Sequence, residues 1–149
     1  MKASEPQLKL RRAKKTDAAR IAELSGELGY PTTTREMKTR LAHLISATQQ
    51  HAVILAEVDK VVIGWIHVSV SPLLEVPLRA EVNGLIVAES QRSCGAGAKL
   101  LEAAEKWAQA KGCKGMFVRS NVIRERAHFF YERHGYVHFK TQKAFRKPL

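Results

Sequence analysis

A short glycine-containing segment near the middle of the chain has the composition of an anion-binding loop. It reads Arg92-Ser93-Cys94-Gly95-Ala96-Gly97 and leads into a stretch with helical periodicity. Glycines let a backbone approach an anion closely and adopt turn dihedral angles. The start of a helix adds unpaired N–H donors and a partial positive charge, and Arg92 can add a charge-assisted contact. Together these features predict a cradle for a pyrophosphate.

Other phosphate-binding loops fit this segment less well. A Walker A loop places a Lys and a Ser or Thr directly after its last glycine, whereas Ala98-Lys99-Leu100 follows Gly97 here. The three-glycine fingerprint of dinucleotide-binding folds is absent, as is the β-α-β start that accompanies it. A tight strand-to-helix connection without a ligand stays open as the alternative interpretation.

The elements on either side of this loop would position it. A strand is expected over residues 80–87, and a helix follows from about Gly97 to Ala110. The apolar stripe of that helix consists of Leu100, Leu101, Ala104, Trp107 and Ala108. Gly84 lies inside the strand, where a glycine marks either a bulge or close packing, and both interpretations stay open.

The rest of the chain predicts an α/β sandwich around one mixed sheet. Asp59-Lys60 is the expected turn of a hairpin, and Thr34 is the expected cap of the second helix. Further strands are expected at residues 8–11, 52–58, 61–70, 115–120 and 136–140, and further helices at 18–28, after Thr34, and at 124–134. We predict a single domain over residues 1–149, with its core from about residue 8 to 149.

Composition excludes several classes of protein. No apolar run approaches the roughly 20 residues of a membrane span, and residues 1–7 lack the apolar stretch of a signal peptide. We therefore expect a cytoplasmic protein that does not use a membrane. The two cysteines, Cys94 and Cys113, lack the spacing of a disulfide framework or a zinc site, and we expect no metal.

Charge is the unusual feature of the composition. Lys and Arg total 25, and Asp and Glu total 14, which gives a formal net charge of +11. Such a surface attracts polyanions, so nucleic acid and a phosphate-rich cofactor are both candidates. The basic residues form short clusters interleaved with apolar residues, and a solvated basic face is the plain alternative.

Several segments resemble one enzyme family. Residues 87–97, with R-x-x-G-x-G before a helix, are similar to the acetyl-CoA motif of the GNAT superfamily of N-acetyltransferases. Asn121 and the segment Ala127–Tyr136 resemble that family's second landmark, and Leu8–Asp17 resembles its first strand and helix. The resemblance covers about residues 8–149 in the family's order. It implies a three-layer sandwich with a central mixed, splayed sheet and helices on both faces.

The resemblance implies acetyl-CoA as cosubstrate and assigns residues to it. Backbone N–H groups of Gly95, Ala96, Gly97 and Ala98 would hold the pyrophosphate. Arg92, Ser93 and Cys94 belong to the same loop, although Cys94 is a less usual residue there. The strand residues Leu85, Ile86 and Val87 would run beside the pantetheine arm and pair with its amides. Asn121 would contact the cofactor from the neighbouring strand.

Acyl transfer to an amine requires loss of a proton from the amine, stabilisation of the carbonyl oxygen and protonation of the leaving thiolate. Tyr131 matches the family's general acid, and a phenol is protonated at neutral pH. Glu81 is the candidate general base, acting through water, with an exposed strand charge as the alternative. A backbone N–H near Leu85 or Ile86 would polarise the carbonyl.

The acceptor pocket is expected from the loop after the first helix, from residues 69–78 and from the last hairpin. Glu27, Tyr30, Glu75 and Asn83 are the polar candidates there, and His67 could also touch the acceptor. Two carboxylates would suit a cationic amine, although ordinary surface acids would look the same.

The leading hypothesis is an enzyme that moves acetyl from acetyl-CoA to a primary amine by direct attack. A small-molecule acceptor is favoured over a protein, and the family implies a homodimer. The acceptor stays open among amino acids, polyamines, aminoglycoside-like amines and protein amines. One alternative is a basic nucleic-acid-binding domain, which is disfavoured because no such motif is present and the glycine loop would be unexplained. A CoA-binding regulator without turnover is the other alternative.

Overall fold

The computed structural model describes residues 7–92 and 94–149. They form two compact units, one up to Val118 and the other from Arg119 to Leu149. The first unit contains a sheet flanked by helices, and the second contains one helix followed by irregular chain. Ser93 lies outside the described residues, so its predicted place in the anion loop is not described.

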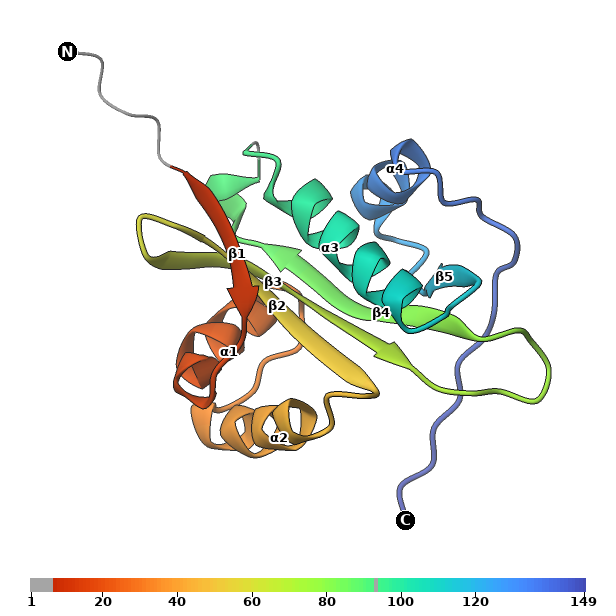
Figure 1. The fold of residues 1–149 in the computed structure, drawn as a ribbon, viewed down its shortest axis with the longest axis horizontal. Helices are drawn as coiled ribbons and strands as arrows, with labels where there is room; N and C mark the ends of the chain where they lie inside the picture. The colour runs from red at the N-terminus through yellow and green to blue at the C-terminus, as the bar shows by residue number, and fades with distance from the viewer. Residues whose placement is uncertain (1–6, 93) are drawn as a thin grey trace. The chain divides into compact units, whose positions relative to one another are not determined.

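One mixed sheet forms the centre of the first unit (Figure 1). Its strand order is β1-β2-β3-β4-β5; the first four strands pair antiparallel, and β4 and β5 pair parallel. The strands are β1 (Leu8–Arg12), β2 (His51–Val58), β3 (Val61–Val70), β4 (Arg79–Val87) and β5 (Gly115–Val118). Asp59 and Lys60 both have positive φ, 49° and 65°, and form the predicted turn between β2 and β3.

Helices cover both faces of this sheet (Figure 1). On one face, α1 (Ala18–Glu27) and α2 (Thr34–Ser46) form a core in which Ile21, Leu24 and Leu41 meet Val53, Leu55 and Trp65. On the other face, α3 (Ala96–Ala110) packs on β2, β3 and β4 with the predicted buried stripe. The short 3₁₀ turns η1 (Lys15–Asp17) and η2 (Glu89–Gln91) precede α1 and α3, and α4 (Glu125–Arg133) lies in the second unit.

The cap predicted for α2 is wrong by one residue. Thr33, not Thr34, is the N-cap: its hydroxyl accepts the N–H of Glu36 at 3.1 Å. The Glu36 carboxylate in turn accepts the N–H of Thr33 at 3.2 Å, which completes a capping box. Both threonines could accept the bond, but only Thr33 is followed by a Glu at the third helical position.

The predicted strand at residues 136–140 is also wrong. The described chain has no strand or helix after α4, and the sheet includes no residue beyond Val118. The alternate apolar residues Val137 and Phe139 stay 81% and 66% exposed. Alternation shows that a segment could bury one side, but a strand also needs a neighbour to share its hydrogen bonds.

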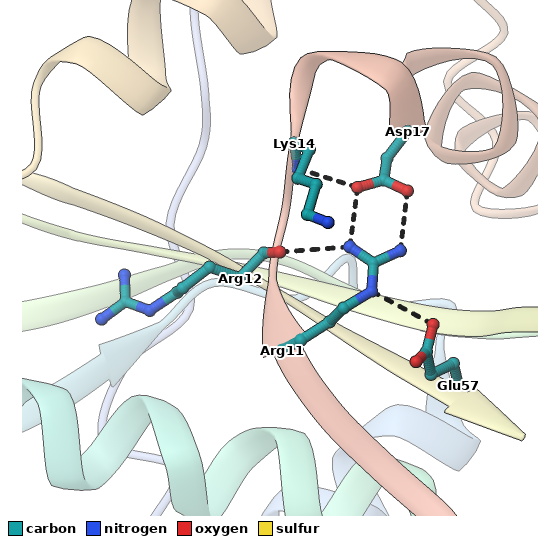
Figure 2. Close-up of polar contacts among 5 residues, drawn as sticks. All are labelled: Arg11, Arg12, Lys14, Asp17 and Glu57. Atoms are coloured by element: carbon teal, nitrogen blue, oxygen red, sulfur yellow. Dashed lines mark hydrogen bonds and ion pairs between the residues drawn. The ribbon is translucent and has the colours of Figure 1, made fainter. Parts of the chain in front are cut away.

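Arg11 ties β1, β2 and the entry to α1 together (Figure 2). Its two terminal nitrogens donate to the two oxygens of Asp17, both at 2.8 Å, and its Nε donates to Glu57 at 3.1 Å. Asp17 also accepts the backbone N–H of Lys14 at 2.7 Å. These hydrogen bonds, with Arg11 foremost, hold the pKa of Asp17 below its usual range.

We predict that Asp17→Asn lowers the free energy of unfolding at pH 7 by about 1–3 kcal/mol, because the amide cannot accept both bonds from Arg11. Because the folded-state pKa of Asp17 is below the ordinary value of 3.8, its carboxylate contributes its full stability at pH values above 3.8. That stability is lost as the pH falls through the lower folded-state pKa. Urea unfolding from pH 7 to pH 2 should therefore show the two proteins converging at the acid end.

The matched control is Glu23→Gln, which removes an ion pair between Arg20 and a Glu23 side chain that is 70% exposed. It should change stability by at most about 0.5 kcal/mol. Equal losses for the two variants at pH 7 would contradict the role given to the Asp17 contacts.

Candidate active site

The start of α3 has the geometry of an anion site. Gly95 is the N-cap, with φ +79°, a left-handed conformation that favours glycine. The N–H of Lys99 makes the first helical bond, to the Gly95 carbonyl oxygen at 3.2 Å. The N–H groups of Ala96, Gly97 and Ala98 therefore have no acceptor within the helix. Gly95 has no side chain to cap this helix end, and a Cβ placed on it would meet nothing within 4 Å.

The residues just before α3 return the chain to the end of β4. Arg92 is exposed, and its Nε donates to the Val87 carbonyl oxygen at 3.5 Å, a long bond that leaves the guanidinium accessible. Cys94 is exposed and has a free thiol, and its backbone N–H donates to the Gln91 carbonyl oxygen at 3.3 Å. Both residues thus belong to the short connection that leads into α3, and their contact with an anion stays a prediction.

A bulge divides β4 into two parts. The β3–β4 register runs Val68↔Val82 and then His67↔Gly84, which leaves Asn83 as the extra residue. Pairing with β5 covers only Arg79–Val82. Leu85, Ile86 and Val87 still pair with β3, but on their other side the described sheet has no strand. This is the splayed edge expected beside a pantetheine arm.

Gly84 satisfies both interpretations left open for it. It adjoins the bulge, and a Cβ at this position would lie 2.7 Å from the Trp65 ring. The side chain of Leu28, at the end of α1, is 3.9 Å from the same point. The bulge, Trp65 and the α1–α2 loop therefore converge at one place on the sheet.

Next to this place lies a polar row, by which we mean His51, His67, Ser69, Glu81 and Asn83. They lie on the face of β2, β3 and β4 that α1 and α2 cover. On that face they adjoin the buried Val53, Trp65 and Ile86 of the same three strands. Asn83 Nδ2 donates to Ser69 Oγ at 2.7 Å and to the Glu81 carbonyl oxygen at 3.3 Å. The structure thus groups two predicted site residues, Glu81 and Asn83.

Two histidines are in contact in this row. His51 Nδ1 and His67 Nε2 are 3.0 Å apart, so one ring donates a proton to the other. Burial, with a smaller contribution from the His51 ring, lowers the pKa of His67 from 6.5 to about 4. His67 is therefore neutral at pH 7. Sequence reasoning singled out His67 but missed His51, whose only signal was its place on the paired strand of the predicted hairpin.

The remaining acceptor candidates are more scattered. Glu27 ends α1 and Tyr30 follows it; both are exposed, and the Tyr30 carbonyl oxygen accepts the Ser25 hydroxyl at 2.8 Å. Glu75 is exposed in the loop between β3 and β4. Because Leu28 approaches Gly84, the α1–α2 loop lies near the polar row, whereas no described contact joins Glu75 to it.

Asn121 and Tyr131 belong to the second unit. The Asn121 side-chain oxygen accepts the N–H of Ile123 at 3.1 Å, and its carbonyl oxygen bonds His128 Nε2 at 2.9 Å. Tyr131 is half-buried between Phe130 and Tyr136, with ring centroids 5.3 and 5.6 Å away. Burial raises the pKa of Tyr131 to about 12, against a smaller opposing effect of Arg124.

Comparison with known proteins gives the family of the chain. The model of the acetyltransferase (GNAT) family matches residues 18–136. The chain belongs to this family. It is an N-acetyltransferase, as the sequence predicts.

Individual GNAT proteins show the same relationship. An aminoglycoside N(6')-acetyltransferase type 1 of Klebsiella aerogenes is 27% identical over 140 residues, which are 90% of this chain and 92% of that protein. An aminoglycoside N-acetyltransferase solved with CoA superposes with a TM-score of 0.88, at 18% identity and full coverage of both chains. Glucosamine-6-phosphate N-acetyltransferase of Arabidopsis thaliana gives a TM-score of 0.81, at 18% identity over 94% of this chain and 98% of that one.

None of the described helices combines the length and apolar character needed to span a bilayer. The described residues contain no group of three or more His, Cys, Asp or Glu side chains arranged to hold a metal ion.

We predict that Gly84→Ala lowers the free energy of unfolding by about 1–3 kcal/mol, because the new Cβ would overlap the Trp65 ring. Gly26→Ala is the control: this helical glycine has open space around its Cβ position, so the substitution should stabilise α1 by about 0.5–1 kcal/mol. Denaturant unfolding measures both. A Gly84→Ala protein as stable as the wild type would show that the ring does not constrain β4.

Proposed function

We propose that this enzyme transfers the acetyl group of acetyl-CoA to a primary amine of a small molecule by direct attack of the amine on the thioester. The observation that carries the proposal is that the N–H groups of Ala96, Gly97 and Ala98 have no acceptor within α3. This helix start follows, after η2, a strand that has one edge without a partner in the described sheet. A diphosphate fits the N–H groups at the helix start, and a chain of amides fits the open edge of the strand. Coenzyme A carries a diphosphate and, next to it, the amides of its pantetheine arm.

The proposed CoA site uses backbone more than side chains. The N–H groups at the start of α3 would donate to the diphosphate oxygens, helped by the helix dipole and by Arg92. Gly95 keeps the approach open, since no neighbouring atom lies within 4 Å of its Cβ position. The net charge of +11 favours a polyanionic cosubstrate of this kind.

The pantetheine arm would lie along the second part of β4. There the backbone groups of Leu85 and Val87 face an edge without a strand in the described sheet, whereas those of Ile86 face β3. Buried backbone donors and acceptors need partners, and the two amides of pantetheine would supply them as an added strand does. An N–H near Leu85 or Ile86 would then be available to the thioester oxygen.

The chemical step consists of attack by the amine nitrogen, collapse of the tetrahedral intermediate and departure of the CoA thiolate. Tyr131 would protonate the thiolate, since a phenol with a pKa of about 12 keeps its proton at neutral pH. The proton that the nitrogen loses as the intermediate collapses would restore the phenol, so that amide and free thiol are the products. Neither free cysteine suits an acyl-enzyme route: Cys94 is in the anion loop, and burial raises the pKa of the Cys113 thiol. Glu81 remains a candidate for the base.

Support for a small-molecule acceptor comes from related enzymes and from the polar row. The relatives named above act on aminoglycosides or on glucosamine 6-phosphate, which are both amino sugars. The polar row offers neutral hydrogen-bonding groups and one carboxylate to an amine that carries hydroxyl groups. An amino sugar is therefore the first acceptor to test.

The test is a thiol-release assay with acetyl-CoA over neamine, glucosamine 6-phosphate, spermidine, free amino acids and a lysine peptide. Mass spectrometry of each product should show the gain of one acetyl group on an amine. Calorimetry measures CoA binding in parallel. Failure to bind CoA would refute the proposed cosubstrate, and binding without turnover of any amine would favour a regulator.

We predict that Gly97→Asp weakens CoA binding at least about tenfold, because it places a carboxylate among the N–H groups that would hold the diphosphate. An acidic residue in the first turn of a helix stabilises it, so the variant should unfold no more easily than the wild type. Thr34→Asp, which adds the same charge to the start of α2, is the control. Unchanged CoA affinity in Gly97→Asp would place the diphosphate elsewhere.

We predict that Tyr131→Phe slows turnover by about 10²-fold while changing the Kd for CoA less than threefold, as expected for loss of a general acid. Tyr136→Phe removes the hydroxyl of the ring that meets Tyr131 edge to face, and it serves as the control. Stopped assays should show the Tyr131→Phe defect in kcat. Equal kcat values for the variant and the wild type would remove Tyr131 from the reaction.

A further inference from the structure

The contact between His51 and His67 gives the polar row a property that no single residue in it has. In a neutral pair, one ring nitrogen of the 3.0 Å contact carries the shared proton and the other accepts it. Whichever tautomer is present, the two outer nitrogens, His51 Nε2 and His67 Nδ1, then differ. One holds a lone pair and the other holds an N–H.

Such a pair can take up a proton at one end and release another at the other end. His67 is a poor place for a proton to remain, because burial lowers its pKa to about 4. His51 is also partly buried, on the strand farther from β4. A proton that reaches His67 is therefore passed on to His51.

The pair is placed where an acceptor amine would be needed. His67 is the register partner of Gly84, at the bulge where β4 leaves β5. The proposed thioester site, near Leu85 and Ile86, begins one residue further along the same strand. Leu28 brings the α1–α2 loop to the same point. The same face of β4 also carries Glu81 and Arg79, whose guanidinium lies over the Phe117 ring. On β2 this face carries Glu57, which is bonded to Arg11, and Glu27 ends α1 nearby.

Trp65 fixes the surroundings of the pair on β3. It lies two residues before His67, is only 9% exposed, and places the end of its ring 2.7 Å from the Cβ position of Gly84.

We propose that His51 and His67 form the proton relay that deprotonates the acceptor amine, with His67 meeting the amine and His51 passing the proton to solvent. This inference rests on the acetyl transfer proposed above. A primary amine is mostly ammonium at neutral pH and has no lone pair for attack until one proton leaves.

The proton balance of the relay is closed. The ammonium proton moves to His67 Nδ1, the proton on His67 Nε2 moves to His51 Nδ1, and the proton on His51 Nε2 leaves to water. The amine gains the lone pair that forms the new C–N bond, and both rings end neutral. Exchange with water in the reverse direction restores the starting tautomers before the next turnover.

The experiment compares His67→Gln, His51→Gln and the exposed control His43→Gln with the wild type. The acceptor is whichever amine of the panel the wild type acetylates fastest. We expect His67→Gln to lower kcat/KM at pH 7.5 by about 10²-fold and His51→Gln by about tenfold. His43→Gln should change nothing, and all variants should keep the wild-type Kd for CoA.

Two further readouts separate a relay from a structural role. The His67→Gln defect should shrink as pH rises toward 9.5, because more of the amine is then already deprotonated. Added imidazole should partly restore a His51→Ala variant. If His67→Gln fails to fold, His51→Gln and the rescue of His51→Ala still decide the question.

The outcomes are distinguishable. A wild type that binds CoA but acetylates no amine refutes the transfer and the relay together. An active wild type with undiminished His67→Gln and His51→Gln rates overturns the relay alone. The relay is also overturned if the defect is the same at every pH and imidazole restores nothing, or if Glu81→Gln alone reproduces the pH-dependent loss.

Discussion

The parting of β4 from β5 after Val82 is the constraint on which the rest of the structure depends. A full parallel ladder would have used the backbone groups of Leu85, Ile86 and Val87 within the sheet. Instead, Asn83 bulges against β3 and the strand continues with one free edge. The Trp65 ring occupies the space that a side chain at Gly84 would need, so the packing of the core enforces this course of the strand.

One strand thereby divides two chemical environments. The face of β4 that looks toward α1 and α2 carries the polar row and suits an uncharged or cationic amine. Its carboxyl end leads through η2 into the glycine-capped start of α3, which suits a polyanion. The basic character of the chain favours the second environment, while the carboxylates of Asp17 and Glu57 are bonded to Arg11 at the β1 edge of the sheet.

Local patterns predicted most elements within one or two residues. The Asp59-Lys60 turn, the amphipathic α3 and the glycine at the bulge each depend on neighbours in the chain, so the sequence is enough to find them. The failed strand at residues 136–140 depended on a partner strand, which no local pattern can supply. The roles of Asn121 and Tyr131 stay predictions, because they depend on how a residue in one unit meets a cosubstrate held by the other.

The contact between His51 and His67 could not be predicted because it depends on a register shift. The β2–β3 pairing slips by one residue between Ala56 and Glu57, with Ile63 as the extra residue. Without that slip, His51 would lie opposite Val68, whose side chain is on the α3 face, and the two histidines would occupy opposite faces of the sheet. A single extra residue in β3 therefore creates the pair.

The most direct test of the account follows the backbone amides by nuclear magnetic resonance as CoA is added. The account predicts that CoA shifts the amide resonances of Ala96, Gly97 and Ala98 as well as those of Leu85 to Val87. Pantetheine, which has no diphosphate, should shift only the second group. Saturation with CoA that leaves the amides at the start of α3 unmoved would contradict the claim that they hold the diphosphate.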